Sequence, residues 1–119
     1  MKLLLDHHRT ELLANGRANG ILRDSGLDEH DFSPVVKLFC PWGAATWLLS
    51  ELDPEDEDTA FGLCDLGMGC PELGNVSLRE IEALTGPGGL RIERDIHFKA
   101  DRSLSAYAED ARLHQRIVA

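Results

Sequence analysis

Carboxylates crowd the middle of this chain of 119 residues. The run ELDPEDED, residues 51–58, has six acidic side chains in eight positions, and Asp65 and Glu72 follow it in a glycine-rich segment. Carboxylates that a fold brings together can hold a divalent cation or divide the roles of acid and base between them. One interpretation is therefore a small metal-binding or hydrolytic site that uses Glu51, Asp53, Asp65 and Glu72.

A solvated hairpin tip is the other interpretation of the acidic run, and it requires no chemistry. Acidic residues at such a tip keep an exposed strand edge soluble. Pro54 interrupts the run, and no glycine stands where the calcium loop of an EF-hand needs one. The sequence therefore predicts no dedicated calcium site, and we assign neither a metal nor a cofactor to the chain.

No other known catalytic motif stands out. Asp95 and His97 could share one face of a strand, but no serine or cysteine nucleophile is positioned beside them. The glycine-rich segments DLGMG and GPGG lack the GKS, GKT or GxGxxG of phosphate-binding loops. The histidines have no HExxH or other ligand spacing; they are His7, His8, His30, His97 and His114. No catalytic residue is predicted.

The formal net charge is −9, and the negative charge lies in the middle of the chain. Residues 35–78 carry one basic and eight acidic side chains, whereas residues 79–119 carry seven of each. A surface formed by these acidic residues would repel the phosphate backbone of a nucleic acid. The chain also has no basic patch with interleaved aromatic residues. Direct nucleic-acid binding is therefore disfavoured, and a protein is the expected partner.

The location of the protein is predicted from its N-terminus and its cysteines. No apolar run approaches the roughly 20 residues of a membrane helix. Charged residues follow the first leucines before a signal-peptide core could form. Cys40, Cys64 and Cys70 are an odd number without CxxC spacing, which is typical of reduced, partly buried thiols. We expect a cytoplasmic protein that does not contact a membrane.

The first half of the chain predicts one short helix and three strands. Asp6 is expected to cap this helix at its start and the Asn15-Gly16 pair to end it, because these residues favour helix caps. Residues 17–33 would then be a surface connection. Three apolar runs of strand length follow, each bounded by proline or glycine: PVVKLFCP, TWLLSELDP and TAFGLCDLG. Short loops join them, so an antiparallel meander is predicted.

The second hairpin of this meander has a predicted register. With residues 54–58 as its connection, Glu51 lies opposite Phe61 and Trp47 lies opposite Asp65. Both faces of the hairpin are substantially apolar. Helices or a partner subunit should therefore cover both faces.

The second half of the chain predicts two helices separated by a strand. Ser77 and Glu80 form a capping box that begins a helix. The run RIERDIHF alternates between apolar and polar residues, as a half-exposed strand does. Ser105 is expected to cap a final helix. Together, these predicted elements indicate a single α+β domain over residues 1–119, with a mainly antiparallel sheet of four or five strands and about three helices packed on it.

Two tryptophans flank the turn PWGAAT. Trp47 lies inside a predicted strand and should belong to the core. Trp42 lies in the loop between Pro41 and Gly43, and a partly exposed tryptophan near an acidic rim can anchor an interface. The alternative is that Trp42 folds back onto the core.

The chain resembles a known family over nearly its whole length, from LLANG to LSAYAEDAR, and the most specific positions lie in its centre. The matching positions include the segments TWL, FGL, DLG and PELG, together with Glu51, Asp53 and Pro54. On these residues the chain resembles the domain of unknown function 2958 family, small proteins encoded mainly on bacterial plasmids, conjugative elements and phages. Cys70 departs from the pattern, since an aromatic residue is expected there. The resemblance implies an accessory gene of a mobile element and implies no reaction.

These features support hypotheses of different kinds. The first is an acidic accessory protein of a mobile element that acts by protein–protein interaction, as an anti-defence inhibitor of the anti-restriction or anti-CRISPR type. Its acidic surface would compete for the basic groove of a nucleic-acid-binding defence protein of the host or the element. That surface is expected to comprise Trp42, Glu51, Asp53, Glu55, Asp56, Glu57, Asp58, Asp65 and Glu72. The second hypothesis is the metal-binding or hydrolytic domain, and a homodimeric structural module is the third.

Overall fold

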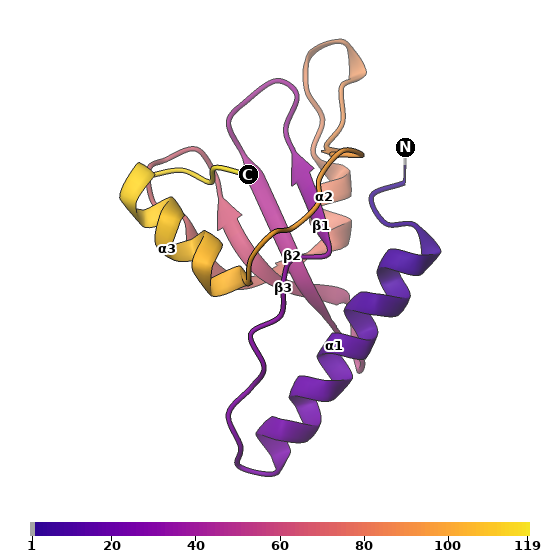
Figure 1. Cartoon of the computed structure of the whole chain (residues 1–119). Coiled ribbons are helices and arrows are strands. Elements are labelled where there is room, and N and C mark those ends of the chain that lie inside the picture. The colour runs from indigo at the N-terminus through magenta and orange to yellow at the C-terminus, as the bar shows by residue number, and fades with distance from the viewer. Residues whose placement is uncertain (1) are drawn as a thin grey trace.

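Residues 2–119, which the computed structural model describes, form one sheet of five antiparallel strands with three α-helices packed against it (Figure 1). The strand order is β4-β3-β2-β1-β5. The elements follow one another along the chain as α1 (Asp6–Asp24), β1 (Val36–Phe39), β2 (Thr46–Asp53), β3 (Asp56–Asp65), β4 (Glu72–Ser77), α2 (Leu78–Ala83), the 3-10 turn η1 (Pro87–Gly89), β5 (Glu93–Arg94) and α3 (Leu104–His114). The predicted α+β class is confirmed. Within these residues, no helix is long and apolar enough to cross a membrane.

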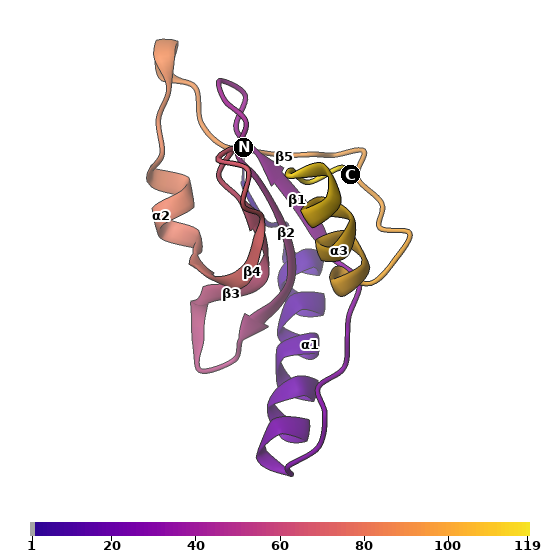
Figure 2. The same cartoon turned by 90° about the vertical axis from the view of Figure 1, so that its left-hand side faces the viewer.

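The sheet separates two apolar cores. Side chains alternate along β2, so Trp47 and Leu49 face one core while Leu48 faces the other. Both α1 and α2 contribute to the first core, through residues such as Leu12 and Ile81. The second core lies against α3, and Figure 2 shows α2 and α3 on opposite sides of the sheet. The expectation that both faces would be covered is confirmed.

A β-bulge at Ser50 reverses the alternation in the second half of β2. The pairing with β3 shifts by one residue between Leu49 and Glu51, which leaves Ser50 without a partner on β3. Glu51 pairs with Phe61, and both face the side of the sheet that carries α3. Leu52 points back into the first core, where it is fully buried.

The bulge explains which predicted strand pairs are right. Glu51 lies opposite Phe61, as predicted. Trp47 lies opposite Cys64 and not opposite Asp65, because the extra residue at Ser50 displaces every earlier pair by one position. The prediction was wrong there because a bulge changes the register without an obvious sequence signal.

The connection between β2 and β3 is shorter than predicted. Asp53 pairs with Asp56, so a turn of two residues, Pro54 and Glu55, replaces the expected connection of residues 54–58. β3 therefore begins inside the acidic run. The glycine-rich segment that follows β3 leads into the edge strand β4, which was not predicted.

Helix α1 continues beyond the predicted stop at Asn15-Gly16, because both residues serve tertiary packing. The side-chain amide of Asn15 donates to the carbonyl oxygen of Ser50, 3.0 Å away. Gly16 lies so close to β2 that a Cβ atom there would stand 1.9 Å from the carbonyl oxygen of Leu52. These contacts hold α1 against the bulge, and the predicted surface connection begins only after Asp24.

Other local predictions differ from the structure at element ends. Leu5 and not Asp6 occupies the position before α1. Ser103 and not Ser105 caps α3, since its hydroxyl accepts a hydrogen bond from an N–H of the first turn. The predicted C-terminal strand shortens to β5, because Ile96 lies in an exposed turn.

The close packing of Gly16 leads to a test. We expect Gly16→Ala to lower the free energy of unfolding by about 1–3 kcal/mol, because the added methyl group must displace the backbone of β2. Gly20 lies on the same helix and has only a flexible arginine side-chain atom near its Cβ position, 3.8 Å away. Gly20→Ala is therefore the control, and it should raise stability by up to about 1 kcal/mol through helix propensity. Urea denaturation of both variants measures this; equal effects would contradict the proposed packing role.

Candidate functional site

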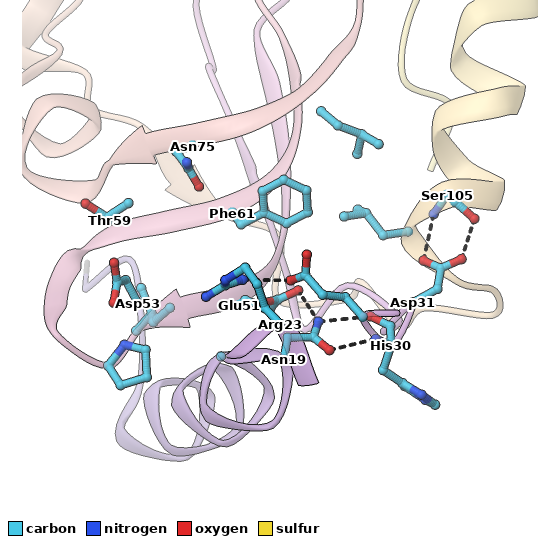
Figure 3. Close-up of a pocket in the computed structure, with 16 residues that line it drawn as sticks. Asn19, Arg23, His30, Asp31, Glu51, Asp53, Thr59, Phe61, Asn75 and Ser105 are labelled. Atoms are coloured by element: carbon cyan, nitrogen blue, oxygen red, sulfur yellow. Dashed lines mark hydrogen bonds and ion pairs between the residues drawn. The ribbon is translucent and has the colours of Figure 1, made fainter. Parts of the chain in front are cut away.

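A groove of about 540 Å³ opens beside the hairpin β2–β3 (Figure 3). Helix α1, the strands β2, β3 and β4, the segment before β1 and the first turn of α3 all contribute to its walls. Its lining residues are Gly16, Asn19, Arg23, Glu29, His30, Asp31, Glu51, Leu52, Asp53, Pro54, Thr59, Phe61, Leu73, Asn75, Leu104 and Ser105. The volume is within the range of about 300–1,000 Å³ that is usual for ligand sites.

Asn19 organises the floor of this groove. Its side-chain amide donates to the Glu51 carboxylate over 2.8 Å and to the carbonyl oxygen of His30 over 3.0 Å. Its side-chain oxygen accepts from the N–H of His30 over 2.7 Å. Asn19 is 1% exposed, so these bonds form away from water, where an unpaired amide would be costly. The residue joins α1, β2 and the segment before β1 at one point.

Glu51 is half-buried at this point, and its surroundings disfavour the ionised form of its carboxyl group. Burial raises the pKa of Glu51, and the nearby carboxylate of Glu29 raises it further. The hydrogen bond from Asn19 and the charge of Arg23 act in the opposite direction without cancelling these effects. Within residues 2–119, only one oxygen of the Glu51 carboxylate, Oε2, accepts a hydrogen bond, and Glu51 forms no ion pair.

Three other charged groups of the groove, Arg23, Glu29 and Asp31, already have partners within it. A guanidinium nitrogen of Arg23 lies 2.9 Å from a carboxylate oxygen of Glu29. Asp31 accepts hydrogen bonds from the N–H and the hydroxyl of Ser105, which tie the segment before β1 to α3. Partial burial of Asp31 would raise its pKa, but the bonds from Ser105 prevail and lower it.

The hairpin tip, residues 53–58, carries most of the predicted acidic surface. Asp53 accepts a hydrogen bond from the N–H of Glu55 over 2.9 Å, and Asp56 accepts one from the hydroxyl of Thr59 over 2.9 Å. These bonds keep the tight turn in one conformation. Asp53, Glu55 and Asp56 are exposed and form no ion pair with any residue among 2–119.

Two acids of the tip are partly neutralised by arginines. Glu57 lies 3.7 Å from the guanidinium of Arg9 in α1. Asp58 lies 3.5 Å from the guanidinium of Arg79 in α2 and also accepts a hydrogen bond from the hydroxyl of Ser77. Hydrogen bonds from Ser77 and Arg79 lower the pKa of Asp58. Asp58 thereby reinforces the start of α2, which Ser77 caps as predicted.

The remaining predicted site residues lie away from the tip. Asp65 is at the other end of β3 and only 3% exposed; it accepts hydrogen bonds from the N–H groups of Gly67 and Ile117, over 2.8 Å and 3.0 Å. Glu72 is exposed at the start of β4. Trp42 is half-buried and packs against the first core, with its ring over Gly86.

The four acids of the metal or hydrolytic hypothesis therefore do not meet. Glu51 and Asp53 both line the groove, Asp53 at its exposed end beside the tip, whereas Asp65 supports the C-terminal segment and Glu72 faces solvent. No three histidine, cysteine, aspartate or glutamate side chains of residues 2–119 come together in a way that could hold a metal ion. The cysteines are unpaired, and burial raises the pKa of Cys64 to about 11, so its thiol stays protonated at neutral pH.

The residues that build the groove beside Glu51 were not predicted from the sequence. Asn19 fell in the predicted surface connection, because the helix was ended too early. The helical spacing of Leu12, Gly16 and Asn19, all buried in α1, is the signal that could have found it. Nothing in the sequence marks Asp31 as the partner of Ser105.

Comparison with known proteins identifies the class of the chain. A model of the family described as "Protein of unknown function (DUF2958)" matches residues 3–118. The chain belongs to this family, as its sequence resemblance implied. No curated protein and no solved structure matches it. Its function must therefore be argued from its own surface.

The buried carboxylate of Asp65 leads to a second test. Asp65→Ala leaves two N–H groups without an acceptor, and we expect the free energy of unfolding to fall by about 1–3 kcal/mol. Hydrogen exchange at the Ile117 amide should speed up more than exchange in α1. Glu72→Ala, which removes an exposed acid nearby, should change stability by less than about 0.5 kcal/mol. Unchanged protection at Ile117 would show that Asp65 does not hold the C-terminal segment.

The raised pKa of Glu51 predicts a pH-dependent stability. The folded protein binds a proton at Glu51 more readily than the unfolded chain does, so ionised Glu51 destabilises the fold above its raised pKa and not below its ordinary value of 4.5. Glu51→Gln should therefore raise the melting temperature at pH 7, and the difference should vanish as the pH falls below 4.5. Thermal melts across this range measure it. Glu55→Gln, at the exposed tip, should have the smaller effect at pH 7.

Proposed function

We propose that this protein acts by binding a basic surface of another protein with its acidic hairpin tip. The observation that carries the proposal is the exposure of Asp53, Glu55 and Asp56, which have no neutralising partner among residues 2–119, on a hydrogen-bonded turn. Ionised side chains held in place by their own backbone lose little freedom on binding. The tip is therefore suited to recognition of cationic groups.

The position of the tip in the sheet supports this role. The last pair that β1 forms with β2 is at Leu49, and the last pair that β4 forms with β3 is at Thr59. The tip extends past both neighbouring strands; α1 and α2 reach it at Glu57 and Asp58, which leaves residues 53–56 as the part that a partner can approach. Because the separated acids do not form a common chemical site, this geometry favours recognition over catalysis.

The charge of the whole chain supports a partner that binds nucleic acid. A protein of net charge −9 attracts basic surfaces at long range, and its attraction weakens as salt screens it. Grooves that bind nucleic acid are rich in lysine and arginine, since they neutralise phosphates. We propose that the tip competes for such a groove in a cytoplasmic defence protein of the restriction or CRISPR kind, as part of the accessory functions of a mobile element.

Charge neutralisation at the tip tests this proposal. The variant Asp53→Asn/Glu55→Gln/Asp56→Asn keeps hydrogen-bond acceptors in the turn and removes three charges. Nucleic-acid-binding proteins captured from a host lysate by the wild type should bind the variant at least about tenfold more weakly, mainly through slower association. Surface plasmon resonance with the purified partner, at several salt concentrations, measures both rates.

A matched variant separates local recognition from total charge. Glu11→Gln/Glu82→Gln/Glu109→Gln removes three exposed acids elsewhere on the surface and should bind within about threefold of the wild type. Equal losses in the two triple variants would show that only net charge matters. Capture of no nucleic-acid-binding protein by the wild type would refute the proposal as well.

A further inference from the structure

The groove beside the tip is a second feature that a partner would meet, and its chemistry is more selective than that of the tip. The tip presents solvated charge alone. The groove presents a half-buried carboxylate next to apolar side chains, among them Phe61 and the 40% exposed Leu73. Four carboxylates and one guanidinium line it, so it has the same sign of charge as the tip.

We infer that this groove receives an arginine side chain of the partner, with its guanidinium on Glu51 and its stem against Phe61 and Leu73. The inference rests on the proposed function, because it supposes the same basic partner. It adds a specific residue type and a specific position to a contact that would otherwise depend on charge alone.

The pairing of β2 with β3 places the two chemical requirements side by side. Glu51 and Phe61 are direct cross-strand partners on the same face of the sheet, so their Cβ atoms lie within about 5.5 Å of each other. Figure 3 shows the Phe61 ring and the Glu51 carboxylate on neighbouring strands of the groove. A planar guanidinium can stack on an aromatic ring while its edge donates to a carboxylate, which a lysine ammonium cannot do equally well.

Glu51 and Asp53 line the groove without a counterion among residues 2–119, and of the two only Glu51 is half-buried. Arg23 forms its ion pair with Glu29, and Asp31 is engaged by Ser105. Glu51 has its Oε2 held by Asn19, which orients the carboxylate, while no residue among 2–119 donates to Oε1. An arriving guanidinium would offset the burial and the repulsion from Glu29 that disfavour the ionised carboxylate.

Short peptides test the inference without knowledge of the partner. The probes are acetyl-Gly-Arg-Gly-amide, its lysine analogue and its citrulline analogue, which keeps the shape of arginine and lacks the charge. In an NMR titration the arginine peptide should bind with a dissociation constant of about a millimolar, the scale of a single charge-assisted contact. Amide shifts should concentrate at Asn19, Glu51 and Phe61. The citrulline peptide should bind at least about tenfold more weakly, and the lysine peptide should lie between the two.

Two single variants locate the contact. Glu51→Gln, which keeps the bond to Asn19, should weaken binding of the arginine peptide by at least about tenfold. Glu82→Gln removes the same charge from an exposed position on α2, outside the groove and the tip, and should change the affinity by less than about twofold. Equal binding of the arginine and citrulline peptides, or undiminished binding to Glu51→Gln, would overturn the inference.

The same variants distinguish this inference from the proposed function. If neutralisation of the tip abolishes partner binding while Glu51→Gln retains full affinity for the partner, the groove inference is wrong and the proposed function stands. If the partner still binds the tip variant, the proposed function is wrong, whatever the arginine peptide does at Glu51.

Discussion

The bulge at Ser50 is the local constraint on which the arrangement of this protein depends. Without the extra residue, Glu51 would share the face of Leu49 and would be forced into the first core, and Leu52 would point away from it. A half-buried carboxylate would then occupy a position that now holds apolar side chains. Because of the bulge, residues of the single strand β2 contribute to the first core, to the groove and to the acidic tip.

Close approaches of the backbone make the bulge possible. Gly62, opposite Leu49, lies where a Cβ atom would stand 2.0 Å from the carbonyl oxygen of Leu48. Gly16 permits a similar approach of α1 on the other side. The carbonyl group of Ser50 accepts from the amide of Asn15. Because a buried carbonyl without a partner is costly, this bond and the two glycines belong to one structural unit with the bulge.

Long-range hydrogen bonds from polar side chains to the backbone hold the irregular segments in place. Asn19 binds the segment before β1, Asp31 binds the start of α3, and Asp65 binds the C-terminal segment at Ile117. These side chains provide hydrogen bonds to segments that lack the regular backbone hydrogen bonds of a helix or a sheet. The carboxylates of Asp31 and Asp65 are committed to such bonds, whereas Asp53, Glu55 and Asp56 at the tip are exposed.

The amino-acid sequence by itself determined the class of fold, the central hairpin and the concentration of acids at its turn. These properties follow from apolar periodicity, from proline and glycine at element ends and from the local density of charge, all of which act over a few residues. The pairing of Glu51 with Phe61 could also be predicted, since it lies on the turn side of Ser50 and since the second register shift, between Leu52 and Asp53, falls within the connection predicted at residues 54–58.

Only the tertiary structure decided which acids share a surface. It placed Asp65 in the interior, Glu51 half-buried in a groove and Asp53 at the exposed end of that groove, although all three lie within one hairpin. Asn15 and Gly16 looked like a helix end because their local preferences favour one, yet contacts with β2, more than 30 residues away, are satisfied only when the helix continues. Interactions between segments so distant in sequence outweigh the small free energies of local propensity, and they leave no signal in either segment alone.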